Sequence, residues 1–83
     1  MIVKVLAAET DLTSATNVSL ATVVRLVNNN SSIDVVTRKN SSGTTLGSFT
    51  LTANSVTFAE KDPTDTLEGG ATILAAKVAY NIS

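Results

Sequence analysis

Short segments rich in Val, Thr, Ile and Phe alternate along the chain with clusters of Asn, Ser and Gly. Residues 22–27 form the first clear apolar segment, and a cluster of Asn and Ser at residues 28–32 follows it. Such clusters are typical of turns, because Asn tolerates a positive φ and hydrogen-bonds its own backbone. The pattern predicts an antiparallel meander of strands over residues 22–27, 33–38, 44–51 and 56–61.

Alternation within residues 33–38 assigns the two faces of that strand. Ile33, Val35 and Thr37 are expected on the buried face. Asp34 and Arg38 are expected on the other face, as a surface ion pair of small energy. The Asn triplet at residues 28–30 is interpreted as turn chemistry and not as a binding patch.

The flanks of the meander are expected to add strands at both ends. Residues 2–6 have strand composition, residues 18–20 suit a short strand, and β-branched residues within 71–79 favour a strand over a helix. Residues 64–68 suit one helical turn, capped by Thr64 or Asp65. The prediction is therefore an all-β fold, a small antiparallel β-sandwich or flattened barrel of about six to seven strands.

Residues 1–83 are expected to form a single β-domain, with residues 1–17 as an extended arm or an edge strand. Within the arm, residues 7–17 are expected to be flexible enough to reach a neighbouring subunit. The predicted core consists of apolar residues from all strands: Val5, Val24, Leu26, Ile33, Val35, Phe49, Leu51, Val56, Phe58, Ile73 and Val78.

The small size of the chain points to assembly. A domain of 83 residues buries only about 60% of the surface that its unfolded chain exposes. Small domains compensate with disulfides, metals or oligomerisation, and the chain has no Cys. We therefore expect a homo-oligomer, or a chain that docks on a larger assembly. The alternative is a compact β-domain that folds alone, as many domains of this size do.

Composition excludes several functional classes. The absence of His and Cys excludes zinc fingers and every catalytic triad that uses either residue. A net charge of −1 without a basic stripe argues against nucleic-acid binding. No apolar run approaches the ~18 residues of a membrane span, and residues 1–8 lack the basic region of a signal peptide, so synthesis in the cytoplasm is expected.

Catalysis is not expected either. Ser and Thr are abundant, but none stands in a nucleophile-elbow or Ser-x-x-Lys motif. Three aromatic residues in so short a chain leave little volume for a deep desolvated pocket. We expect a protein that is not an enzyme and that uses no cofactor.

Residues 60–68 hold the densest group of charged side chains, with four acids in nine positions. Their oxygens could ligate Ca²⁺, but the spacing is not that of an EF-hand loop and Lys61 opposes a cation. We interpret the segment as a solvated loop with Asp and Thr caps, in which Pro63 stops the preceding strand because it cannot donate to a strand ladder.

Residues 44–52 carry no charge at all. Exposed edge strands normally carry charges that prevent edge-to-edge pairing, so this segment is either a central strand or one that pairs with another chain. Alternation places Leu46, Ser48 and Thr50 on one face and Gly47, Phe49 and Leu51 on the other. Gly47 suits a bulge or a close approach of another backbone. The candidate interaction residues of the two segments are Thr44, Thr45, Leu46, Ser48, Lys61, Asp62, Pro63 and Asp65.

Five stretches together resemble small virion structural proteins of tailed bacteriophages, especially marine and cyanobacterial ones. They are residues 21–28, 33–38, 43–51, 56–67 and 75–80, which cover most of residues 18–80. The most distinctive stretch is Glu60-Lys61-x-Pro63-x-Asp65-x-Leu67, which follows a predicted strand.

The resemblance implies an all-β accessory protein of the particle, without catalytic residues. Its leading form is a decoration (cement) protein that stabilises the capsid between subunits of the major capsid protein, so its location would be the virion and its partner that protein or another virion protein. A head–tail connector, neck or tail component is the alternative. A cellular β-sandwich binding module is the third reading.

Overall fold

The computed structural model describes residues 2–81, which form eight strands and no helix. They are β1 (Ile2–Val5), β2 (Thr10–Asp11), β3 (Val23–Asn28), β4 (Asp34–Lys39), β5 (Thr45–Leu51), β6 (Val56–Glu60), β7 (Thr66–Glu68) and β8 (Ile73–Asn81). The all-β prediction is confirmed. The two strands of only two and three residues, β2 and β7, are too short to leave a period-2 pattern in the sequence.

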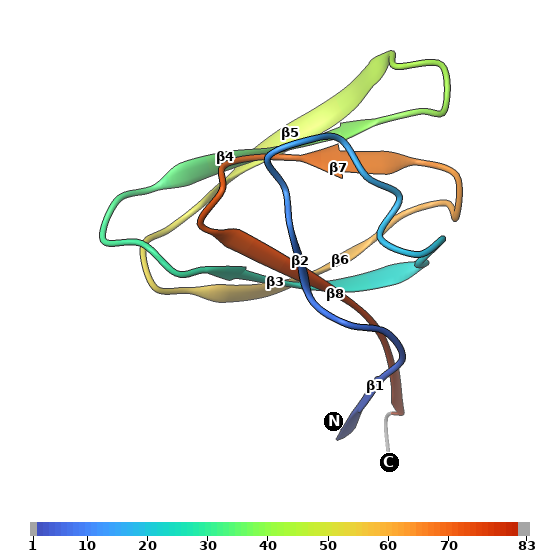
Figure 1. Ribbon diagram of the computed structural model, residues 1–83, viewed down its shortest axis with the longest axis horizontal. Helices are drawn as coiled ribbons and strands as arrows, with labels where there is room; N and C mark the ends of the chain where they lie inside the picture. Colours follow the sequence, from blue (N-terminus) through green and yellow to red (C-terminus); the bar gives the residue numbers. More distant parts are fainter. Residues whose placement is uncertain (1, 82–83) are drawn as a thin grey trace.

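Two antiparallel sheets pack as a sandwich, seen as the upper and lower layers of Figure 1. The larger sheet has the order β1-β8-β3-β6, and β2 also pairs with β8. The smaller sheet has the order β5-β4-β7. Strand β5 is thus an edge of one sheet and β6 an edge of the other, and a short turn joins them directly in sequence.

The core lies between the sheets and contains the aliphatic residues that the pattern assigned with least ambiguity. Val24, Leu26, Leu51, Ile73 and Val78 are buried as predicted. Val5, Ile33, Val35 and Val56 are instead exposed, Phe49 is partly exposed, and Phe58 is half-buried.

The predicted faces of β4 were wrong. Val36 is fully buried, whereas Val35 on the opposite face is 48% exposed. Since both positions are Val, apolarity alone cannot choose between the two faces. The alternation also predicted Arg38 on the outer face. Arg38 instead shares the inner face with Val36, because it pairs there with the carboxylate of Asp65, which lies in the turn of residues 61–65 (the 61–65 turn).

The segment before β3 is also part of the domain, contrary to the expectation of a flexible arm at residues 7–17. Leu12 is fully buried, and its carbonyl accepts a hydrogen bond of 2.8 Å from the Gly69 amide. Strands β1 and β2 both pair with β8, and β1 with the end of β8 extends away from the sandwich (Figure 1). This segment is therefore docked on its own domain.

Residues 18–20 form a left-handed turn and not the predicted short strand. Val18, Ser19 and Leu20 have φ values of 52°, 57° and 59°. The Asn17 side chain accepts a hydrogen bond from the Leu20 amide, and the buried Val18 side chain anchors the turn in the core. The turn leads directly to Ala21, whose carbonyl takes part in the site described below.

Within the Asn triplet, Asn30 makes a turn contact of the predicted kind, because its Oδ1 accepts a hydrogen bond from the Ser32 amide at 3.4 Å, whereas Asn28 is the last residue of β3. The fully buried side-chain amide of Asn28 donates to the carbonyls of Leu51 and Ser32 at 3.1 and 2.9 Å, and to the carbonyl of Thr52 at 3.3 Å. The amide therefore joins the end of β3 to the end of β5.

Candidate functional site

Strand β5 is not the central strand that its lack of charge allowed, because it is an edge strand with only β4 as its strand partner. Every residue of β5 except Leu51 is exposed. None of these residues is charged. The strand therefore leaves backbone donors and acceptors on one side without a strand partner, and it lacks the charged side chains that usually protect such an edge.

A β-bulge changes the direction of one side chain near the start of β5. Arg38 lies opposite Gly47 and Lys39 opposite Thr45, so Leu46 has no residue opposite it on β4. Because of this irregularity, Leu46 lines the same cleft as Phe49, although simple alternation put them on opposite faces. The expected bulge is thus present, and its consequence is that two large apolar side chains share one cleft.

This cleft lies where the edges of the two sheets face each other and has a volume of about 280 Å³. Leu46 and Phe49 of β5 line it, and Ala59 of β6 and the buried Leu67 of β7 contribute further apolar surface. The volume is just below the ~300–1,000 Å³ of typical small-molecule pockets. The size suits a single side chain of a partner better than a free ligand.

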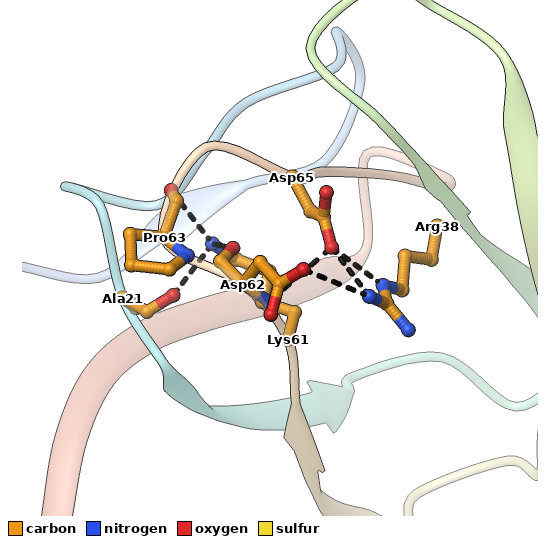
Figure 2. A network of polar contacts seen from close by, with 6 residues as sticks. All are labelled: Ala21, Arg38, Lys61, Asp62, Pro63 and Asp65. Carbon is orange, nitrogen blue, oxygen red and sulfur yellow. Dashed lines mark hydrogen bonds and ion pairs between the residues drawn. The ribbon is translucent and has the colours of Figure 1, made fainter.

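Lys61 corrects the interpretation of the charged segment as a solvated loop. Its side chain is only 4% exposed, although it carries an ammonium group. Figure 2 shows this ammonium directed at three carbonyl oxygens: that of Ala21 at 2.6 Å, and those of Asp62 and Pro63 at 3.3 Å. Burial lowers the pKa of Lys61, and the nearby carboxylate of Asp65 opposes that shift.

Asp65 is the second buried charge of this turn, at 4% exposure. Its Oδ2 accepts hydrogen bonds from Arg38 Nε at 2.8 Å and Nη2 at 2.5 Å, and from the Asp62 amide at 3.2 Å (Figure 2). The hydrogen bonds from Arg38 hold the pKa of Asp65 below its ordinary value. Arg38 therefore pairs with Asp65 and not with Asp34, and residues 64–68 form a turn followed by β7 and not a helical turn.

The two predicted interaction segments meet at Arg38. Its backbone pairs with Gly47 of β5 and with Leu67 of β7, and its side chain lines the cleft. Of the predicted residues, Leu46 and Ser48 line the cleft, Thr45 lies on the edge strand, and Thr44 closes the turn before it through hydrogen bonds with Asn40. In the other segment, Lys61 and Asp65 are structural, whereas Asp62 and Pro63 are exposed.

Six residues that line the cleft were not among the predicted interaction residues: Arg38, Gly47, Phe49, Ala59, Glu60 and Leu67. Phe49 had been assigned to the core and Arg38 to the surface. Glu60 is exposed at the end of β6, and no ion pair involves it among the described residues. No sequence signal singled out Arg38, because β4 also carries the charged residues Asp34 and Lys39.

Within residues 2–81 no group of three or more acidic side chains is close enough to hold a metal ion. The same residues contain no helix of the length and apolarity needed to cross a membrane. A second depression, of about 410 Å³, lies beside β3 and β8, and Glu60 and Lys77 are among the residues that line it. We take the β5 edge and its cleft as the candidate site, because that edge is uncharged and has a strand partner on one side only.

Comparisons with protein-family models, with curated protein sequences and with solved structures gave no match to this chain. The resemblance to phage virion proteins thus stays a prediction.

Proposed function

We propose that this chain is a non-enzymatic structural protein of a virus particle, which binds a neighbouring particle protein through the β5 edge and stabilises the capsid as a decoration protein. The resemblance of residues 18–80 to phage virion proteins supplies the biological setting. The partner proposed in that setting is the major capsid protein.

One observation carries the proposal: an edge strand whose residues are exposed except for Leu51, with no charge on it. A monomer gains nothing from such an edge, because it invites pairing with other chains. In an assembly the same edge supplies backbone hydrogen bonds to a partner strand. Many such contacts repeated over a lattice reinforce one another.

Quantitative mass spectrometry of purified particles tests this function. A copy number comparable with that of the major capsid protein supports decoration. A few copies per particle would instead indicate a neck or tail component. Absence from particles would overturn the virion assignment and leave a cellular binding module.

A further inference from the structure

We propose that the β5 edge binds an extended segment of the partner protein, that this segment inserts one apolar side chain into the cleft beside β5, and that it places a Lys or Arg against Glu60. The inference rests on the proposed function, because it names the chemistry of the partner at the same site.

The backbone of β5 supplies the first part of the recognition. Strand β5 pairs with β4 on one side only, so an added antiparallel or parallel strand would continue the three-stranded sheet. Residues 45–50 are exposed and uncharged. The partner strand can therefore cover them without removing a charge from water.

The cleft supplies the second part. The bulge brings Leu46 to the cleft that Phe49 also lines, and these side chains are 49% and 37% exposed. A Leu, Ile or Phe side chain from the added strand would cover both and contact Leu67 and Ala59. Burying such a side chain contributes about 1.5–3 kcal/mol, so one anchor residue should dominate the affinity.

Charge supplies the third part. Of the positive groups at this side of the molecule, Arg38 is held by Asp65, and the ammonium of Lys61 is occupied by three carbonyls. Lys77 lines the second depression together with Glu60, but no ion pair joins the two side chains within residues 2–81. Glu60 has no ion pair within residues 2–81, although it lines the cleft. A basic side chain of the partner is the complementary group. Since residues on one face of a strand are two positions apart, we place it two positions from the anchor.

Two segments of a second copy, β5 and residues 7–17, fit the site less well. Pairing of β5 with β5 of another copy brings no positive charge to Glu60, because β5 has no charged residue. Residues 7–17 of another copy do not provide the strand either, since Leu12 is buried in its own domain.

The test uses an array of eight-residue peptides rich in Ser and Thr. Position four is Ala, Val, Leu, Ile or Phe, and position six is Lys, Gln or Glu. Fluorescence polarisation with the full chain should show binding only with a large apolar residue at position four. A Lys at position six should bind about fivefold more tightly than a Glu, the size expected for an exposed charge pair that is reversed.

Variants of the protein locate the binding. Leu46→Ala should weaken binding at least tenfold, whereas Val35→Ala, which truncates a half-exposed residue on the opposite face of the same sheet, should leave it unchanged. Glu60→Lys should invert the preference at position six, and Glu9→Gln should not. All four positions are on the surface, and a thermal melt by circular dichroism checks that each variant is folded.

Several results would overturn the inference. They are no binding by any peptide, equal losses for Leu46→Ala and Val35→Ala, or an unchanged preference for Lys in Glu60→Lys. A dimer in light scattering that Ser48→Lys dissociates would show that a second copy occupies the edge. Since particle composition is measured separately, failure of the peptide test leaves the virion assignment standing, and absence from particles leaves the peptide result standing.

Discussion

The 61–65 turn carries three charged side chains and buries two of them, whereas β5 carries none and exposes every residue but its last. The expected arrangement is the reverse, because charged side chains normally stay in water and uncharged strands normally lie inside. The buried charges have fixed partners: Lys61 has three carbonyls and Asp65 has the Arg38 guanidinium. The exposed strand has none on its free side.

The buried charges of the 61–65 turn and the exposed uncharged residues of β5 thus have different explanations, the stability of the domain for the first and, as we propose, the binding of a partner for the second. The buried charges connect the left-handed turn before β3, the end of β6 and the inner face of β4, so they stabilise the domain. The uncharged edge does nothing for the isolated domain. We therefore expect changes in the turn to alter the free energy of unfolding, and changes on β5 to alter binding.

The largest effect is expected for Lys61→Ala. The substitution leaves a buried carbonyl of Ala21 without its donor and removes hydrogen bonds made by a charged group, which together should cost about 3 kcal/mol of unfolding free energy. Urea unfolding followed by far-ultraviolet circular dichroism measures the loss. Lys61→Met retains most of the apolar stem but lacks the ammonium. If the hydrogen bonds of the ammonium stabilise the domain, this variant should lose a similar amount of unfolding free energy. As a control, Lys4→Ala on exposed β1 should change stability by less than about 0.5 kcal/mol. Wild-type stability of Lys61→Met would contradict a structural role of the ammonium.

The pH dependence of stability gives a second measurement of Lys61. Its folded pKa lies below the ordinary value of 10.5, so between the two values the unfolded chain binds more protons than the folded chain. The unfolding free energy should therefore rise with pH across that alkaline window. Lys61→Met should lack this rise, and an identical slope in both proteins would contradict burial of the charge.

The next effect concerns the two valines of β4. Val36→Ala removes fully buried methyl groups and should cost about 2 kcal/mol, whereas Val35→Ala should cost less than about 0.5 kcal/mol. The same urea titration compares them. Equal losses would mean that the two faces of β4 are not distinguished as the structure has them.

These two valines also show which parts of the fold can be predicted from the sequence and which cannot. The all-β class and the positions of the long strands follow from alternation and turn residues, and unambiguous core residues such as Leu26 and Ile73 follow with them. The face of β4 does not follow, because the choice depends on Arg38 meeting Asp65 from a turn 27 residues away. The bulge that brings Leu46 beside Phe49 is likewise a property of strand pairing, and Glu60 is identified only once that cleft exists.

A smaller effect is expected for Asp65 in acid. Its folded pKa lies below the ordinary value of 3.8, so its contribution to stability is present above that value and is lost as the pH falls through the folded pKa. Asp65→Asn should therefore be less stable than the wild-type chain at neutral pH, and the difference should shrink as the pH falls below about 3.8. Thermal melts from pH 2 to pH 7 measure this difference, which would stay constant if the carboxylate were not the stabilising species.

The smallest effect on stability is expected on β5, and it is the most informative about function. Ser48→Lys places a charge at an exposed position of the edge strand, so the unfolding free energy should change by less than about 0.5 kcal/mol. The same lysine should block strand addition, as charges on natural edge strands do, and particles should then lose the protein on purification. Thr57→Lys on β6 is the comparison variant that should destabilise the domain, because Thr57 is half-buried and lies opposite the fully buried Leu26. If Ser48→Lys unfolded the domain as Thr57→Lys does, β5 would belong with the 61–65 turn among the structural elements. If it left both stability and particle binding unchanged, the edge would have no partner.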